Sequence, residues 1–343
     1  MSYSVRTDDP VARVSAVGGT PRKSALGQFA IALTFALSAV PVAAEDLKAA
    51  DIHPAGYPNV VAIENLGKKL EVATNGRLKL KMFPGGVLGD EKALIEQTQV
   101  GAIDIVRISL GAVGPVVPDV NVFNMPFVFR DEAHMRKVID GELGQEILDK
   151  ITASPAKLVG LGWMDGGTRN LYTKKPVKVP TDLKGQKIRM MGNPLFVDTM
   201  NAMGGNGISM GTGEVYSALQ TGVIDGAENN PPTYVSQNHY TVAKNYSLTG
   251  HLIIPEVFVF SKVKWDKLSK DDQALIRKLS REAQMEQRTL WDARVATDTA
   301  KLKAAGVEFI AVDKKQFYDL TAPVREKYGK DNAALIKRIE ATK

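Results

Sequence analysis

The chain contains no cysteine among its 343 residues. Disulfide bonds, thiol catalysis and cysteine-ligated zinc are therefore excluded, as is the lipid-modified cysteine that tethers a bacterial lipoprotein. Its four histidines, His53, His134, His239 and His251, do not follow a metal-binding spacing such as His-Glu-x-x-His. We therefore expect no metal and no cofactor.

Signals for catalysis are also scarce. No phosphate-cradling glycine loop is present. The adjacent acids Asp90 and Glu91 would point apart on a helix, which makes them a poor acid/base couple. We predict no catalytic residue and no enzyme activity.

Charge and aromatic content exclude a nucleic-acid-binding protein. The 44 Lys and Arg residues exceed the 38 Asp and Glu residues only slightly, and aromatic residues make up 7% of the chain. The lysines are scattered among acids rather than clustered with aromatics, so the excess is typical of a solvated surface. An apolar content of 44% is enough for one large core or two modest ones.

Only the N-terminus carries a long apolar run. Arg22 and Lys23 precede Ala25–Val40, and small residues follow in Pro41–Ala44. This order predicts that residues 1–44 are a cleaved secretory signal peptide. The alternative is an uncleaved membrane anchor, but the run contains polar residues and is shorter than the ~20 apolar residues that a span needs.

The remaining chain predicts an α/β fold with two lobes. A pattern Gln-x-Gly-x-Ile-Asp occurs twice, in Gln99–Asp104 and in Gln220–Asp225, each time after an amphipathic stretch. In both copies the glycine suits a left-handed helix cap that turns the chain into a strand. A long helix is expected between Ser269 and Gly306, about 35 residues. Strand candidates are Leu78–Phe83, Ile103–Ile108, Leu158–Trp163, Lys187–Met190 and Glu256–Ser261.

Two arginines on short extended segments suit recognition of a carboxylate. Arg169 and Arg189 lie on half-buried strand candidates, and the planar guanidinium group matches the two oxygens of a carboxylate. The alternative is an internal ion pair, for example between Arg169 and Asp165.

Several ordered motifs resemble those of the periplasmic solute-binding proteins of TRAP (tripartite ATP-independent periplasmic) transporters. The resemblance covers nearly the whole chain after residue 45. The motifs are Phe83–Glu91, Asn124–Phe127, Gly166–Arg169, Leu183–Arg189 and Gly213–Asn230.

This resemblance implies a two-lobed solute-binding protein of the Venus-flytrap type, with a long helix that spans both lobes. Lobe I would comprise residues 45–166 and 255–290, and lobe II residues 167–254 and 291–343. It also implies that Arg189 holds the ligand carboxylate and that Arg169 and Asn229 face the ligand, although Asn229 could instead cap the strand that it ends.

The segment His53-Pro54-Ala55-Gly56-Tyr57-Pro58 is similar to the opening of family members associated with hexuronates. The family usually has an aromatic residue before Gly-Glu-Val-Tyr, but Met210-Gly211-Thr212 stands there in this chain. Thr212 would hydrogen-bond an extra hydroxyl or widen the pocket, which leaves a pyranose and an open-chain sugar acid both possible. The full set of predicted ligand-binding residues is Arg189, Arg169, Asn229, His53, Glu91, Arg107, Ser109, Thr212 and Glu256.

The sequence therefore predicts a periplasmic receptor for a small carboxylic acid, such as D-glucuronate or D-galacturonate. It would act as a monomer, deliver its ligand to the small and large TRAP membrane subunits, and bind no nucleic acid. The alternatives are a C4-dicarboxylate or keto-acid receptor, presentation of the ligand to a sensor and, in another class, a sugar-acid lyase or isomerase.

Overall fold

Two β-sheets organise residues 45–343, which, together with residue 19, form the part of the chain that the computed structural model describes. The predicted signal peptide, and with it the alternative of an N-terminal anchor, lies outside the described residues apart from Gly19. Among the helices that are described, none is both long and apolar enough to cross a membrane.

Sheet A has five strands in the order β2-β1-β3-β10-β4. β1 runs parallel to β2 and β3, whereas β10 is antiparallel to both β3 and β4. The three strands β3, β4 and β10 are buried along their whole length because helices cover both faces of the sheet. The bounds are β1 Glu45–Ala50, β2 Leu78–Phe83, β3 Ile105–Ser109, β4 Leu158–Met164 and β10 Glu256–Ser261, and the helices of this part are α1 Pro58–Ala73, α2 Glu91–Gln99, α3 Leu110–Val113, η1 Pro118–Val120, α4 Asn121–Asn124, α5 Glu132–Asp140, α6 Glu142–Ala153 and α10 Lys262–Trp265.

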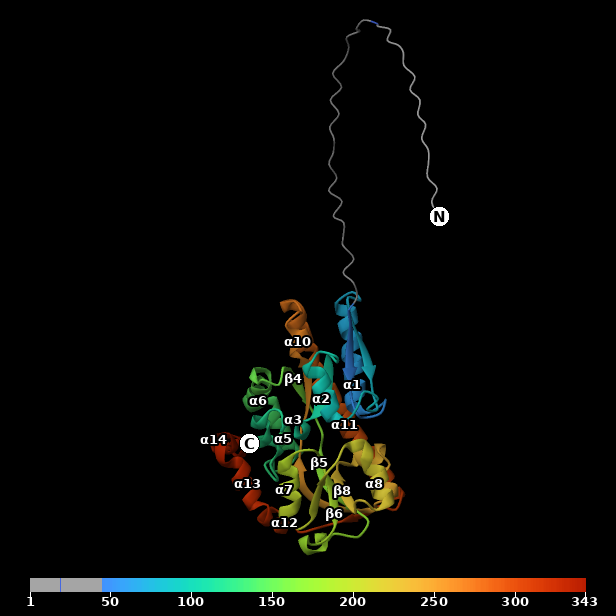
Figure 1. Cartoon of the computed structure of the whole chain (residues 1–343), viewed down its shortest axis with the longest axis vertical. Helices are drawn as coiled ribbons and strands as arrows, with labels where there is room; N and C mark the ends of the chain where they lie inside the picture. The colour runs from blue at the N-terminus through green and yellow to red at the C-terminus, as the bar shows by residue number, and fades with distance from the viewer. Residues whose placement is uncertain (1–18, 20–44) are drawn as a thin grey trace, which may run out of the picture. The chain divides into compact units, whose positions relative to one another are not determined.

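Sheet B has six strands in the order β11-β9-β5-β8-β6-β7. Figure 1 shows its strands β5, β6 and β8 below the elements of sheet A. The bounds are β5 Thr168–Thr173, β6 Lys187–Met190, β7 Asn206–Ser209, β8 Gly226–Asn229, β9 Asn245–Ile253 and β11 Glu308–Ile310, with η2 Pro180–Leu183, α7 Pro194–Ala202, η3 Thr212–Glu214, α8 Val215–Thr221, α9 Pro231–Ser236, η4 His239–Thr241, α12 Lys314–Leu320, α13 Ala322–Gly329, η5 Lys330–Asn332 and α14 Ala333–Ala341.

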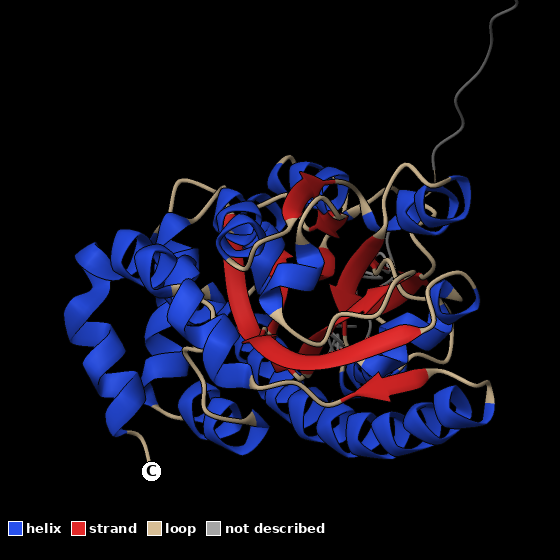
Figure 2. Cartoon of the chain, turned by 90° about the horizontal axis from the view of Figure 1, so that it is seen from below, coloured by secondary structure: helices blue, strands red, loops and turns tan. Residues whose placement is uncertain are grey.

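A single helix of 35 residues, α11 (Lys270–Ala304), connects the two sheets (the long helix in Figure 2). Ser269 caps it by accepting a hydrogen bond from the backbone N–H of Asp272, and acidic residues in the first turn favour its N-terminus. The helix packs against α1 and β4 of the sheet A part and against α9 of the sheet B part. The prediction of one long helix that contacts both parts is confirmed.

The repeated Gln-x-Gly-x-Ile-Asp pattern has the same structure in both copies. Gly101 and Gly222 adopt left-handed backbone conformations, with φ of 77° and 81°. Asp104 then accepts a hydrogen bond from the N–H of Lys48 at 2.8 Å, and Asp225 accepts one from the N–H of Lys187 at 2.8 Å. In each copy, therefore, the aspartate fixes the following strand to its parallel neighbour.

The chain passes from sheet A to sheet B between β4 and β5 and returns between β9 and β10. These passages lie at residues 165–167 and 254–255. The residue boundaries of the two lobes stay a prediction.

Candidate functional site

A polar cavity of about 20 Å³ lies between the two sheets and shares lining residues, among them Arg189 and Thr212, with an adjoining cleft of about 570 Å³. The volume of the cleft, unlike that of the cavity alone, lies within the range of about 300–1,000 Å³ for small-molecule sites. Sheet A elements supply one wall and sheet B elements the other. The lining residues are Ile52, His53, Glu91, Arg107, Ser109, Arg169, Arg189, Met191, Thr212, Asn229, Thr233 and Glu256. All nine predicted site residues are thus brought together.

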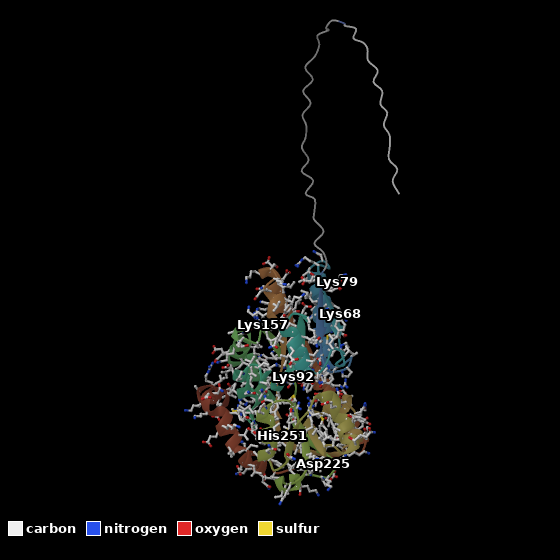
Figure 3. All side chains as sticks on the ribbon, in the orientation of Figure 1. Lys68, Lys79, Lys92, Lys157, Asp225 and His251 are labelled. Atoms are coloured by element: carbon white, nitrogen blue, oxygen red, sulfur yellow. The ribbon has the colours of Figure 1, made fainter. Side chains whose placement is uncertain are left out.

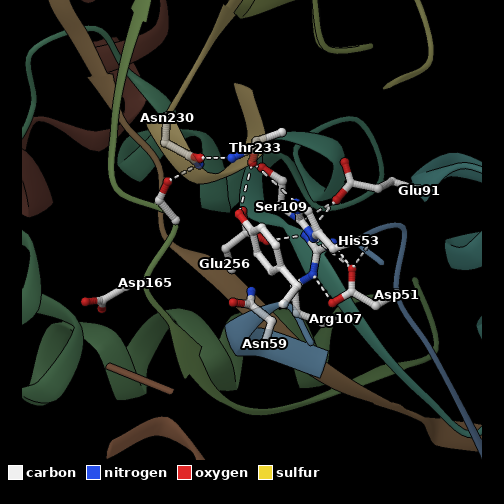
Figure 4. Close-up of polar contacts among 12 residues, drawn as sticks. Asp51, His53, Asn59, Glu91, Arg107, Ser109, Asp165, Asn230, Thr233 and Glu256 are labelled. Atoms are coloured by element: carbon white, nitrogen blue, oxygen red, sulfur yellow. Dashed lines mark hydrogen bonds and ion pairs between the residues drawn. The ribbon is translucent and has the colours of Figure 1, made fainter. Parts of the chain in front are cut away.

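Arg107, on β3, is the centre of an ion-pair cluster (Figure 4). Its Nε donates to Asp51 at 3.0 Å, and its Nη2 donates to Asp51 and lies 2.7 Å from Nδ1 of His53. Its Nη1 donates to both Glu91, at 3.1 Å, and Glu256. Since every N–H of the guanidinium group has a protein partner, none is left for a ligand. Arg107 lines the cavity and acts by positioning the carboxylates around it.

The same cluster controls the charge of its acids. Burial opposes ionisation of Asp51, but Arg107 and His53 outweigh it and lower the pKa of that carboxyl. Burial raises the pKa of Glu256, and the neighbouring Glu91 adds to the rise. Asp51 therefore stays ionised, whereas Glu256 is more readily protonated than an ordinary glutamate.

Arg169, on β5, is held by Glu228 of the neighbouring strand β8. Nε and Nη2 donate to the two carboxylate oxygens at 2.5 and 2.8 Å, and Nη1 donates to Oδ1 of Asn229 at 2.9 Å. Burial opposes the charge of Arg169, but Glu228 outweighs it and raises the pKa. The alternative of an internal ion pair is therefore confirmed for Arg169, but its partner is Glu228 and not Asp165, which pairs with Arg136. One N–H of Arg169 is left for a ligand.

Arg189, on β6, is different because its partners are neutral. Nε donates to the carbonyl oxygen of Met210 at 2.8 Å, and Nη2 donates to Oγ1 of Thr212 at 3.2 Å. No carboxylate among residues 45–343 lies within 4.0 Å of its nitrogens, although the residue is only 2% exposed. Burial lowers its pKa. A buried cation without a counter-ion is costly, so this guanidinium group is suited to an anionic ligand.

Other polar atoms of the cavity also lack protein partners. Oγ of Ser109 is buried and makes no hydrogen bond to any described residue. Glu91 uses Oε1 for the N–H of Ser109 and for Arg107, which leaves Oε2. Asn229 uses its oxygen to accept from Arg169 and from the N–H of Asn230, which leaves the amide nitrogen. These atoms offer both donors and acceptors to a hydroxylated ligand.

Thr212 has a role that its position in the sequence did not indicate. It lies at the start of η3, and its hydroxyl group accepts the hydrogen bond from Arg189. It therefore helps to orient the guanidinium group. Thr212 and Arg189 also line an outer cleft that adjoins the cavity and has Lys92 on one side and Glu214 on the other. In Figure 3, Lys92 lies between the part that carries Lys68 and the part that carries His251.

Sequence reasoning missed three polar residues that build the site. Asp51 and Glu228 hold Arg107 and Arg169, while Thr233, on α9, accepts or donates hydrogen bonds with Tyr57, at 3.0 Å, and with Nε2 of His53, at 3.4 Å. The local sequence gives no signal for these contacts, because their partners lie 56 to 180 positions away. Trp163, on β4, packs against Phe123 and does not line the cavity.

Residues 207–211 match the Gly-x-Ser-x-Gly pattern of a hydrolase nucleophile. Ser209, however, is exposed at the end of the edge strand β7, and its hydroxyl makes no hydrogen bond to a histidine or an acid among the described residues. The match is therefore not a nucleophile elbow. Among residues 45–343, no group of three or more His, Asp or Glu side chains is arranged to hold a metal ion.

Two α/β sheets with a polar cavity between them are the architecture of a two-lobed solute-binding protein. The family model for bacterial extracellular solute-binding proteins, family 7, matches residues 49–331, so the chain belongs to this family. The solved structures that it resembles are TRAP periplasmic solute-binding proteins, which are transport receptors.

A structure from Pseudomonas putida F1 with bound D-glucuronate is 68% identical to this chain, with a TM-score of 0.86 over 87% of this chain and 97% of that one. A structure from a Bradyrhizobium species in complex with D-galacturonate is 45% identical, with a TM-score of 0.85 over 87% of this chain and 100% of the other.

A third relative, from Citrobacter koseri, is known in two states. This chain has a TM-score of 0.86 to the form with bound D-glucuronate, at 56% identity over 87% of this chain and 100% of that one. It has a TM-score of 0.77 to the open form without ligand, over 86% of this chain and 98% of that one. The conformation described here is therefore more similar to the ligand-bound form.

Proposed function

We propose that this protein is the periplasmic receptor of a TRAP transporter for a hexuronate, D-glucuronate or D-galacturonate. The observation that carries the proposal is Arg189, a buried guanidinium group without a carboxylate partner among the described residues, in a cavity between the two sheets. Three of its N–H groups remain after the hydrogen bonds to Met210 and Thr212. They suit the carboxylate of a sugar acid.

The other predicted site residues divide into ligand contacts and positioning residues. Arg169 would contribute one N–H, Asn229 its amide nitrogen and Ser109 its hydroxyl group, while Glu91, Glu256 and His53 would meet the hydroxyl groups of the sugar. Arg107 and Thr212 would act by holding these groups in place. Because an unpaired buried polar group costs about 1–3 kcal/mol, the hydroxyl pattern of the ligand decides affinity as much as its carboxylate does.

The charge of the cavity argues against a C4-dicarboxylate. Of the three arginines that line the cavity, only Arg189 lacks an acidic partner among residues 45–343, and Glu91 and Glu256 line the wall supplied by sheet A. A second ligand carboxylate would meet these acids rather than a cation. The same arrangement tolerates neutral hydroxyl groups.

Binding by purified protein tests the proposal directly. Isothermal titration with D-glucuronate, D-galacturonate, an aldonate, succinate and malate should give micromolar or tighter affinity for at least one hexuronate. Succinate and malate should bind at least a hundredfold more weakly. A preference for either dicarboxylate over both hexuronates would refute the proposal.

The rest of the predicted transport role follows from the family. We propose that residues 1–44 are removed on secretion and that residues 45–166 and 255–290 form lobe I, with residues 167–254 and 291–343 forming lobe II. The mature protein would act as a monomer and deliver its ligand to the small and large membrane subunits. Loss of hexuronate uptake in cells that lack either subunit, with the purified receptor still binding, tests this part.

A further inference from the structure

The cavity and its ion-pair partners contain unequal numbers of positive and negative groups. Three buried arginines face four buried carboxylates, so one negative charge is in excess among these seven groups. The arginines are Arg107, Arg169 and Arg189, and the carboxylates are those of Asp51, Glu91, Glu228 and Glu256.

A sugar acid would increase this imbalance, because it brings one more negative charge into the closed cavity. Two uncompensated negative charges in a buried cluster are strongly unfavourable. Where carboxylates share a site, the usual result is that one of them binds a proton. The free energy of binding then includes the uptake of a proton from solvent.

The four carboxylates differ in how well their ionised forms are held. Asp51 receives two N–H groups of Arg107 and the backbone N–H of His53, and Glu228 is paired with Arg169 through both oxygens. Glu91 receives the N–H of Ser109 in addition to Nη1 of Arg107.

Glu256 receives only that same Nη1 of Arg107, which it shares with Glu91. Its other oxygen, Oε1, has no hydrogen-bond partner among residues 45–343. The ionised form of Glu256 is thus the least stabilised of the four.

The groups that face Glu256 come from several elements. Arg107 on β3 and Arg169 on β5 favour its ionised form, whereas Glu91 on α2 and Asp51 after β1 oppose it. His53 after β1 and the neutral Tyr57 before α1 complete the surroundings. Arg107 and Arg169 are already neutralised by other acids, so neither compensates Glu256 fully.

We propose that Glu256 takes up a proton when the sugar acid binds, so that the closed complex contains Glu256 as a neutral carboxylic acid that donates a hydrogen bond to an oxygen of the ligand. The ligand keeps its carboxylate ionised, and the only bond formed is the O–H bond of Glu256. Glu256 thereby selects for a ligand that has an acceptor oxygen within hydrogen-bonding distance of the Glu256 carboxyl group. The inference rests on the proposed function, since it requires an anionic ligand.

Calorimetry on the unmodified protein tests it. Titration with D-glucuronate at pH 7 in phosphate, HEPES and Tris, whose ionisation enthalpies differ, gives the number of protons exchanged from the slope of the apparent enthalpy. We expect uptake of close to one proton. The Kd should also rise with pH, approaching tenfold per unit above the pKa of Glu256 in the free protein and below its pKa in the complex, because the protonated form is the one that binds.

Two matched variants assign the proton. Glu256→Gln should abolish proton uptake and make Kd independent of pH, whereas His53→Gln, which leaves all four carboxylates in place, should retain both effects. Uptake that persists in Glu256→Gln but disappears in Glu91→Gln or His53→Gln would overturn the assignment.

Equal apparent enthalpies in all three buffers together with a constant Kd would overturn the inference while leaving the proposed function intact. Absence of hexuronate binding by the unmodified protein would refute both. Thermal unfolding of each variant verifies that it is folded, and the measurements on the unmodified protein decide the question even if a variant is not.

Discussion

At the scale of single residues, the three arginines of the cavity have separate tasks that follow from their partners. Arg107 is surrounded by acids and uses all its donors within the protein, and Arg169 is paired through both oxygens of Glu228. Arg189 alone is oriented by neutral groups, a carbonyl oxygen and a hydroxyl. A guanidinium group that is oriented but not neutralised keeps its charge available for a ligand.

Arg189→Lys should therefore weaken hexuronate binding at least tenfold, about 1.4 kcal/mol. Lysine retains the charge but loses the planar fork and the contact with Met210 through Nε. Isothermal titration measures the effect, and Arg338→Lys, at an exposed ion pair with Glu146, is the matched control. Equal affinities of the two variants would contradict the role of Arg189.

At the scale of elements, the two glycines of the repeated pattern end their helical stretches by a left-handed turn. Gly222 directly follows α8 and has φ of 81°, which an L-residue adopts only with strain. A Cβ at this position would meet only Nζ of Lys174 at 3.8 Å, so there is room for it. Any cost of a side chain here is therefore conformational.

Gly222→Ala should lower the free energy of unfolding by about 1 kcal/mol. Gly213→Ala is the control, because no atom lies within 4 Å of its added Cβ and its φ is not positive. We expect the control to be neutral or slightly stabilising in urea denaturation. A similar loss in both variants would show that the left-handed conformation is not the cause.

Elements with a strong local pattern could be predicted from the sequence, and those set by distant contacts could not. β2, β6 and β10 have the expected bounds, and α11 follows from its cap at Ser269 and its helical spacing. The antiparallel insertion of β10 between β3 and β4, in an otherwise parallel sheet, has no signature in the strand itself. The pairing of Arg169 with Glu228 likewise depends on which strands become neighbours.

At the scale of the whole ligand-binding unit, the cavity is complete only when elements of both sheets meet. The hydroxyl group of Thr233 links α9 to Tyr57 and His53, which belong to the sheet A part. These contacts join the two sides without involving the ligand carboxylate. They stabilise the conformation that resembles the ligand-bound relatives, so ligand binding and closure are linked.

Thr233→Val, which preserves the shape of the side chain, should weaken hexuronate binding about three- to tenfold through loss of this contact. Small-angle scattering should also show a smaller decrease in radius of gyration when ligand is added. Thr199→Val is the control, since the buried hydroxyl of Thr199 bonds within α7. If both variants bind and contract alike, closure does not depend on Thr233.

The outer cleft beside Arg189 has a practical consequence. Glu214 is exposed at its rim, and the sequence has no native thiol that would compete for labelling. A cysteine introduced at position 214 could therefore carry one environment-sensitive fluorophore per molecule. Because Lys92 of α2 lines the same cleft, a ligand-dependent change in the cleft would alter the surroundings of the label, and such a labelled protein would serve as an optical biosensor for uronic acids.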